Sequence, residues 1–352
     1  MARMHRDIIA HMNRLYLLAV VLVAGCARPE ETVSFRGKTM GTTYQVSYVS
    51  KEWTATAPRR QLAKSIEDLL AEINQSMSTY IESSIISKIN ASADLREWHP
   101  VDRHFQTVFE RSREVYRDTN HAFNPAVGPL VNAWGFGPED PETLPDETAV
   151  RTLLKVVNFD SFEFRESPPS LKKHLAGARL DFSAIAKGYG VDAIGNLLEQ
   201  QGVRNYLVEI GGEVRARGQH ANGHPWRVGI EKPADNPAKD RTIQMVIELQ
   251  DAGLATSGTY RNYEVKDGKK IAHIIDPATG YPAQNSLLSV SVVAGDTMTA
   301  DAYATALMVM GLDAGLRFVE EHEDLHAYFI AADDSNKLVE ERSSGFPSAV
   351  NQ

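Results

Sequence analysis

The chain has 352 residues, of which 43% are apolar and 24% are charged. This length and composition fit one large globular domain or two medium ones, with enough apolar residues for a sizeable core. The formal net charge of −9 at pH 7 argues against a nucleic-acid partner, because nucleic-acid binding requires a basic face.

The N-terminus has the pattern of an export signal. Three arginines flank or precede a short apolar run from Leu15 to Val23, which is too short to span a bilayer comfortably. Small residues then lead into Cys26, the only cysteine in the chain. We expect residues 1–25 to be a lipoprotein signal peptide and Cys26 to be acylated, so that the mature protein is exported and anchored to a bacterial membrane, facing the periplasm. A cleaved signal that happens to contain a cysteine is the alternative, and Met12 is an alternative start.

The rest of the chain shows no internal repeat, no low-complexity tract and no obvious linker. We expect residues 26–34 to be a tether and residues 35–345 to be the folded domain. Because Cys26 is the only cysteine, the domain has no disulfide and no metal–thiolate site, and its stability depends on its core.

Hydrophobic periodicity predicts the elements of the first half. Alternation from Thr43 to Val49 predicts a half-buried strand. Apolar residues at helical spacing predict one helix from Leu62 to Ile73, a second from Phe105 to Tyr116 and a third after Asp181. Residues 124–145 are rich in glycine, proline and aromatic residues, which predicts a long apolar loop, and such loops in compact chains are usually functional.

The second half is predicted to be richer in strands. A helix is expected at Thr297–Met310, beside Asp296. Strands interleaved with helices, without a strict βαβ rhythm, favour an α+β fold. The predicted strands are Tyr206–Ile210, Trp226–Glu231, Ile243–Leu249, Leu287–Val293 and His326–Ala332.

The segment from Asp181 to Gly190 is expected where a strand ends and a helix begins. Free N–H groups at a helix start favour anions such as phosphate, and the glycines let a ligand approach the backbone. Lys187 is placed to neutralise negative charge. The spacing is not that of a Walker loop, and an ordinary helix start remains the alternative.

Asp301 and Thr305 are four residues apart, so they share one face of the expected helix. A carboxylate and a hydroxyl that project together suit Mg²⁺, which prefers hard oxygen ligands and usually keeps phosphate or water in its other positions. An aspartate in the first turn, favoured by the helix dipole alone, is the alternative.

His273 precedes the turn Asp276–Gly280 and is expected on a strand. A lone histidine is usually structural, but histidine also acts as a base near neutral pH. The sequence has no Ser-His-Asp elbow and no GxGxxG after a strand, which argues against a hydrolase of that type and against a Rossmann enzyme.

Taken together and in order, these segments resemble the ApbE-type family of FAD:protein FMN transferases. The resemblance covers nearly all of the chain after the signal, from about Lys38 to Leu307. Each motif is weak alone, but all of them in sequence order are hard to obtain by chance. The motifs are Met40-Gly41-Thr42, Ala126-Val127-Gly128-Pro129-Leu130, Trp134-Gly135-Phe136-Gly137, the Asp181–Tyr189 segment, Gly211-Gly212, Thr256-Ser257-Gly258, His273–Gly280 and Ala300–Leu307.

The resemblance implies an ApbE-like fold, with mixed or antiparallel sheets flanked by helices, that binds FAD and Mg²⁺. Many members carry Asp where this chain has Asn124; an amide still forms hydrogen bonds, but the changed charge bears on FAD affinity. The Mg²⁺ ligands implied are Asp301, Thr305 and the backbone carbonyl of Ala184. The residues that match the FAD site are Met40, Tyr80, Ala122, Phe123, Asn124, Asp181, Lys187 and Ile275.

The resemblance also implies the reaction. FMN would pass from FAD to a Thr or Ser hydroxyl of another protein and AMP would leave, with Mg²⁺ polarising the pyrophosphate. Membrane-associated redox subunits outside the cytoplasm are the expected acceptors, and we hypothesise that His273 assists deprotonation of the hydroxyl. Two alternatives stay open: hydrolysis of FAD to FMN and AMP, and a non-catalytic flavin-binding lipoprotein.

Overall fold

The computed structural model describes residues 31–50, 56–139, 141–234, 242–259, 263–266 and 269–350. The predicted signal peptide and Cys26 lie outside these residues. Within them, no helix combines the length and the apolar character needed to cross a membrane.

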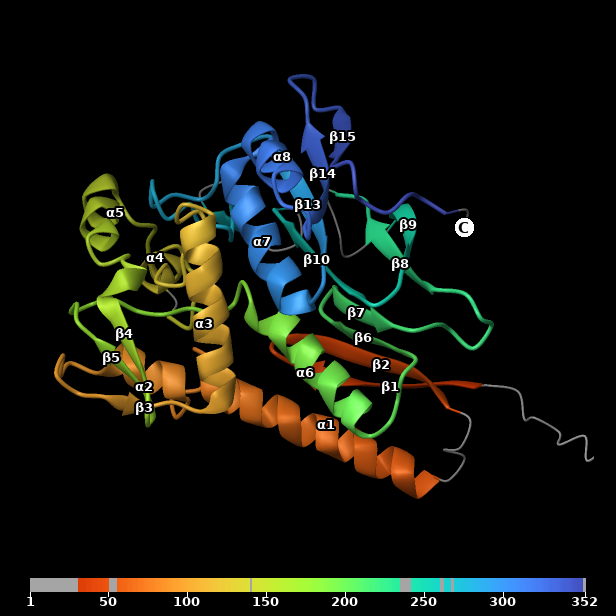
Figure 1. Cartoon of the computed structure of the whole chain (residues 1–352). Coiled ribbons are helices and arrows are strands. Elements are labelled where there is room, and N and C mark those ends of the chain that lie inside the picture. Colours follow the sequence, from red (N-terminus) through yellow and green to blue (C-terminus); the bar gives the residue numbers. More distant parts are fainter. Residues whose placement is uncertain are drawn as a thin grey trace, which may run out of the picture.

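An eight-stranded antiparallel sheet forms the centre of the molecule (Figure 1). Its strand order is β1-β2-β6-β7-β10-β13-β14-β15, so neighbours in the sheet are often distant in the chain. The strands are β1 (Glu31–Thr39), β2 (Thr42–Ser50), β6 (Tyr206–Ile210), β7 (Glu213–Arg217), β10 (Ala252–Gly258), β13 (Leu287–Ala294), β14 (His326–Ala332) and β15 (Leu338–Arg342).

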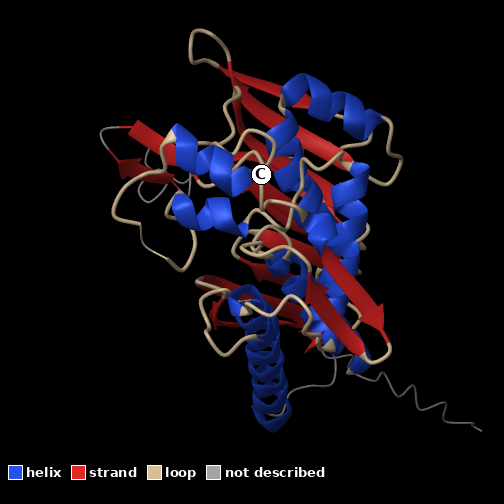
Figure 2. Ribbon diagram, turned by 90° about the vertical axis from the view of Figure 1, so that its left-hand side faces the viewer, coloured by secondary structure: helices blue, strands red, loops and turns tan. Residues whose placement is uncertain are grey.

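Four helices cover one face of this sheet (Figures 1 and 2). They are α1 (Thr56–Met77), α6 (Ala186–Gln200), α7 (Thr297–Met310) and α8 (Leu312–Glu320). Alternate strand residues face them: in β2, Tyr44, Val46 and Tyr48 are buried against α1 and α6. Burying one face in this way is what a period-two hydrophobic pattern requires.

A two-stranded hairpin covers part of the opposite face. It consists of β8 (Trp226–Glu231) and β9 (Ile243–Leu249), and its apolar residues pack on the sheet together with Phe346. The segment after Phe346 stays on this hairpin, since Ala349 forms an isolated antiparallel bridge with Ile247 of β9.

A second region packs beside α7 and α6 around a core rich in phenylalanine. Phe105 and Phe109 of α3 lie against Phe159 and Phe182, with ring centroids 5.2 Å apart for Phe105–Phe182 and 5.0 Å for Phe109–Phe159. A small sheet of order β3-β5-β4 flanks this core. The elements of the region are α2 (Ile85–Ala91), β3 (His99–Pro100), α3 (Arg103–Asp118), α4 (Gly128–Ala133), α5 (Glu147–Leu154), the 3₁₀ turn η1 (Phe159–Ser161), β4 (Phe162–Glu166) and β5 (Pro169–Lys173), and a separate hairpin, β11 (Tyr263–Lys266) with β12 (Lys269–Ala272), follows later in the chain.

The predicted α+β fold with antiparallel sheets flanked by helices is confirmed, as are the strands and helices predicted from hydrophobic periodicity. The tether predicted at residues 26–34 is wrong at its C-terminal end, because β1 begins at Glu31 and pairs with β2. The domain end predicted at residue 345 is also too early, since residues 346 to 350 pack and hydrogen-bond against the β8–β9 hairpin.

Three local predictions need correction. The apolar loop at residues 124–145 contains a short helix, α4, with proline near its start. No strand ends at Asp181; a single bridge between Val127 and Arg179 precedes it. His273 lies in a bend just after β12 and is not part of a strand.

Candidate active site

Three loops meet at the site that the sequence indicates. The backbone N–H of Asp181 donates to the carbonyl of Pro125 at 2.8 Å, which joins the start of the α4 loop to the segment before α6. The indole Nε1–H of Trp134 donates to the carbonyl of Gly280 at 2.8 Å, which joins the far end of the α4 loop to the turn after His273. Hydrogen bonds such as these satisfy the backbone carbonyls of irregular loops and so hold the loops in one conformation.

Tyr80 and His273 both lie against Phe136 in this assembly. The Tyr80 hydroxyl donates to the Phe136 carbonyl at 2.9 Å, and the His273 ring meets the Phe136 ring edge-on, with centroids 6.2 Å apart. Tyr80 is 66% exposed, so its side chain is accessible to a ligand. The pKa of Tyr80 is raised, chiefly by partial burial of its hydroxyl and also by the negative charge of Asp181.

The Ala122–Asn124 segment enters the site mainly through its backbone. The Phe123 ring is 3% exposed and packs in the phenylalanine-rich core, so the ring itself is not available to a ligand. Asn124 accepts the N–H of Ala126 at 2.9 Å through Oδ1, which fixes its own turn. The prediction that Phe123 lines a flavin site stays a prediction, and in this structure only its main chain could meet a ligand.

Asp181 shapes the loop that leads into α6. Its Oδ1 accepts the N–H of Ser183 at 2.7 Å. Ala184 follows in the tight turn closed by the Ile185 N–H, which donates to the Phe182 carbonyl at 3.0 Å. The carbonyl of Ala184 thus belongs to the turn that immediately precedes α6.

Met40 and Ile275 pack in different apolar clusters. Met40 occupies the β1–β2 turn with φ of 49°, and its methyl group would lie 3.1 Å from a Cβ placed on Gly190 of α6. Gly190 therefore lets the methionine approach the helix. Ile275 is 6% exposed and packs in a cluster with Trp134.

The acid–hydroxyl pair lies on α7 and faces two other elements. Asp301 is 3% exposed, and its Oδ2 accepts the N–H of Gly188, in the first turn of α6, at 2.9 Å. Thr305, one turn further on, has its hydroxyl 3.1 Å from that of Ser257 in β10. Burial raises the pKa of Asp301, while the Lys187 ammonium and the Gly188 N–H oppose this rise.

The residues of this pair fit a hard divalent cation. In the described ranges, no group of three His, Cys, Asp or Glu side chains is placed to hold a metal. A cation here would instead need the mixed set of one carboxylate, one hydroxyl and backbone carbonyl oxygen, with phosphate or water completing the shell. This is a donor set of the kind Mg²⁺ accepts, since it is usually bound by one or two carboxylates plus substrate phosphates.

Lys187 is paired with a carboxylate that sequence reasoning missed. Its Nζ lies 2.6 Å from Oε1 of Glu213, at the start of β7, which is 2% exposed. Burial raises the pKa of Glu213; the Lys187 ammonium opposes this and the charge of Asp301 adds to it. Within the described part of the chain, Oε2 of Glu213 has no hydrogen-bond partner. The only signal in the sequence is that Glu213 directly follows the Gly211-Gly212 pair.

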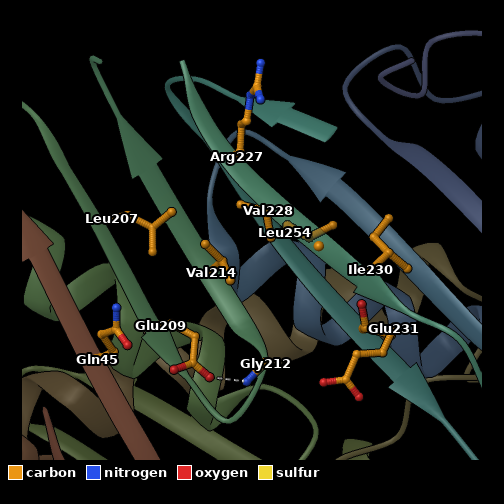
Figure 3. Close-up of a pocket in the computed structure, with 12 residues that line it drawn as sticks. Gln45, Leu207, Glu209, Gly212, Val214, Arg227, Val228, Ile230, Glu231 and Leu254 are labelled. Atoms are coloured by element: carbon orange, nitrogen blue, oxygen red, sulfur yellow. Dashed lines mark hydrogen bonds between the residues drawn. The ribbon is translucent and has the colours of Figure 1, made fainter. Parts of the chain in front are cut away.

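A separate cavity of about 270 Å³ lies on the opposite face of the sheet, between it and the β8–β9 hairpin (Figure 3). Figure 3 shows the Glu209 carboxylate of β6 accepting the Gly212 N–H, a bond of 2.7 Å. None of the predicted site residues lines this cavity, so it is distinct from the site described above. Its lining residues are Gln45, Leu207, Glu209, Gly212, Val214, Arg227, Val228, Gly229, Ile230, Glu231, Leu254 and Thr256.

The fold is that of the flavin-transferase class of α+β proteins. The structure of a flavin transferase ApbE from Vibrio cholerae is similar with a TM-score of 0.81 and 37% identity, covering 90% of this chain and 99% of that one. The apo structure of a Pseudomonas stutzeri flavinyl transferase ApbE is similar with a TM-score of 0.79 and 32% identity, covering 90% and 95%.

The chain belongs to the ApbE family, whose model matches residues 40–329. An FAD:protein FMN transferase of Vibrio cholerae is 39% identical over 331 residues, which cover 94% of this chain and 96% of the relative. One from Haemophilus influenzae is 38% identical over 327 residues, covering 92% and 93%. The family predicted from the motifs is therefore confirmed.

Proposed function

We propose that this protein transfers the FMN half of FAD to a Thr or Ser hydroxyl of other proteins and releases AMP, in a Mg²⁺-dependent reaction. Membership in the ApbE family supports the transfer, and relatives that span nearly the whole chain carry the name FAD:protein FMN transferase. The observation that supports this site most directly is the hydrogen bond from the Gly188 N–H to Asp301. It joins the start of α6 to α7, the helix that bears both Asp301 and Thr305.

Different residues of the site would bind different parts of FAD. Tyr80, exposed beside Phe136, offers a ring face for the flavin or adenine. In the first turn of α6 the Ala186 and Gly188 N–H groups already donate to the Phe182 carbonyl and to Asp301, so it is Lys187 that would offer the phosphates a positive charge. Glu213 holds that ammonium in place, so Lys187 is positioned before a ligand arrives.

In the transfer step, the acceptor oxygen attacks the phosphorus of the FMN half. A new P–O bond forms, the bond from that phosphorus to the bridging oxygen breaks, and AMP departs with the bridging oxygen. Mg²⁺, held by Asp301, Thr305 and the Ala184 carbonyl, would act as a Lewis acid on the pyrophosphate. The proton of the acceptor hydroxyl passes to His273, which the edge-on contact with Phe136 holds in the loop assembly.

The decisive experiment combines product analysis with an acceptor. The protein, produced without residues 1–25, is incubated with FAD, Mg²⁺ and membrane proteins of the source bacterium, and acceptor peptides are examined by mass spectrometry. We expect an FMN adduct on Thr or Ser and one AMP per adduct. FMN and AMP in solution, at the same rate with and without acceptor, would establish the pyrophosphatase instead. FAD bound but unchanged would establish a flavin-binding lipoprotein.

We propose further that the mature protein is lipid-anchored through Cys26 and faces the periplasm, where membrane redox subunits are the acceptors. The apolar run before Cys26 and the small residues preceding it support this. Labelling cells with a palmitate analogue tests it: we expect label on the wild type and none on Cys26→Ser. Equal labelling of the two, or neither labelled, would contradict the anchor.

A further inference from the structure

The first turn of α7 is held by a carboxylate that comes from outside the helix. Asp192, on α6, accepts the backbone N–H of Thr297 through Oδ1 at 3.1 Å and that of Met298 through Oδ2 at 2.8 Å. Asp296 is the N-cap, and its side chain accepts the N–H of Thr299. The first N–H groups of a helix have no partner inside it, so Asp192 satisfies two of them from the neighbouring helix.

Asp192 is itself buried and tied to a third element. It is 7% exposed, and Arg215 of β7 donates Nη1–H to its carbonyl at 3.2 Å and lies 3.4 Å from its Oδ1. Nη2 of Arg215 donates to Oε1 of Glu199, also on α6, at 3.1 Å. A buried carboxylate is tolerated when it is paired and hydrogen-bonded in this way. Asp192 thus joins α6, β7 and α7 at one point.

The packing around this point leaves α7 little freedom to move. A Cβ on Gly253 of β10 would lie 2.5 Å from the Thr297 nitrogen, and one on Gly188 of α6 would lie 2.4 Å from the Thr297 carbonyl oxygen. The Thr297 hydroxyl donates to the Val214 carbonyl at 3.2 Å. The turn is therefore in backbone contact on two sides, and Asp192 sets where along its axis the helix begins.

The position of that turn determines the position of the acid–hydroxyl pair. Asp301 comes one turn after Thr297 and Thr305 comes two turns after it, on the same face of a continuous helix. A shift or rotation at the first turn is carried along the helix to both side chains. The Gly188–Asp301 bond depends on the same register.

We propose that Asp192 is a positioning residue for the metal site: it fixes the axial position and rotation of α7, so that Asp301 and Thr305 are presented to the start of α6. This inference rests on the proposed function, because it concerns the same site. Loss of a direct hydrogen-bond partner of a metal ligand typically lowers metal affinity about 10–100-fold, and Asp192 acts one step further out, through the backbone of α7, so its effect should lie at the lower end of that range.

The test measures metal binding directly, with Mn²⁺ as the probe. Protein saturated with FAD, without acceptor, is titrated with Mn²⁺, and the free ion is followed by electron paramagnetic resonance. For Asp192→Asn we expect the Mn²⁺ dissociation constant to rise about 10-fold. The Mg²⁺ concentration for half-maximal FMN transfer should rise by the same factor, while FAD affinity stays close to that of the wild type.

Asp102→Asn is the matched control for a purely structural effect. Asp102 caps α3 in a similar way, accepting the N–H of Phe105 at 2.8 Å and the hydroxyl of Ser76 at 2.8 Å, but it lies outside the site. We expect this variant to bind Mn²⁺ like the wild type. If Asp192→Asn also bound Mn²⁺ like the wild type, with or without a loss of thermal stability, the positioning role would be wrong.

Two further variants separate the remaining outcomes. Asp301→Ala should abolish Mn²⁺ binding; if it bound Mn²⁺ like the wild type, the metal site of the proposed function would be wrong and the inference would be overturned with it. If Asp192→Asn does not fold, Arg215→Lys decides. This variant keeps the positive charge but cannot bridge Asp192 and Glu199 as the guanidinium does. We expect a smaller rise in the Mn²⁺ dissociation constant, and an unchanged dissociation constant would overturn the inference.

Discussion

Replacing Gly188 by alanine should separate α6 from α7, the two helices at the proposed metal site. A Cβ at this position would lie 2.4 Å from the Thr297 carbonyl oxygen and 2.8 Å from both the Asp301 Cβ and the Met298 Cα. Favourable carbon contacts are near 3.5–4.0 Å, and two of these three atoms belong to the backbone of α7. The clash can therefore be relieved only if α7 moves away from α6 by roughly 1 Å.

The expected magnitudes follow from this displacement. Alanine favours a helix interior over glycine by about 1 kcal/mol, whereas overpacking a buried contact costs about 1–3 kcal/mol or more. The net effect on stability is therefore a modest loss. The effect on transfer should be much larger, about 100-fold, because a 1 Å misplacement of reacting groups costs about that factor. The Gly188–Asp301 hydrogen bond is lost in the same movement.

Urea unfolding and FMN transfer rates measured on the same samples test this reasoning. Gly315→Ala is the control, since it is also a buried helical glycine but meets only side-chain carbons, of Phe329 at 3.2 Å and Leu307 at 3.3 Å. We expect the control to keep both its stability and its rate. If Gly188→Ala transferred FMN at the wild-type rate, the close packing of α6 and α7 would not be what assembles the site.

Further outcomes are expected from the same geometry. Asp301→Ala should reduce FMN transfer at least about 100-fold and FAD affinity much less, as rate and equilibrium dialysis measurements would show; normal turnover in excess Mg²⁺ would contradict this. Trp134→Phe removes the bond to the Gly280 carbonyl and should raise the FAD dissociation constant several-fold, and it should lower the free energy of unfolding by about 1–3 kcal/mol because a buried acceptor loses its donor; unchanged FAD binding would mean that this bond does not shape the site. Burial raises the pKa of Asp192 to about 6, with the charge of Asp296 adding to the rise, so the folded state holds this proton more tightly than the unfolded chain does. The contribution of Asp192 to the free energy of unfolding should therefore fall as pH rises from 4 to 6, by up to about 3 kcal/mol, and urea titrations should show this slope in the wild type but not in Asp192→Asn.

Local pattern predicted the elements well where one face of an element is buried. The strand at Tyr206–Ile210 and the helix at Thr297–Met310 have the bounds that their periodicity indicates. The pattern failed where packing overrides composition. The glycine- and proline-rich segment contains α4, because its apolar residues, Leu130 among them, pack with Val150 and Ile275 from other parts of the chain.

The sequence predicted where two of the candidate site residues lie, while their roles stay a prediction. Spacing alone placed Asp301 and Thr305 on one helical face, and both do lie on α7. It could not indicate that Glu213 pairs with Lys187, or that the Phe123 ring belongs to the core. Both facts depend on which strands and helices become neighbours, and a residue's own surroundings in the sequence do not encode this.

What the sequence alone determined is the set of elements, their buried faces and the family, because hydrophobic periodicity and the order of short motifs are properties of the chain. Which of these groups meet depends on how the elements pack in the folded protein. Asp301 contacts Gly188 across 113 residues, and Asp192 caps a helix that begins 105 residues later. The physical reason is that buried backbone and carboxylate groups must find hydrogen-bond partners, and only the packed arrangement of α6, β7 and α7 supplies them.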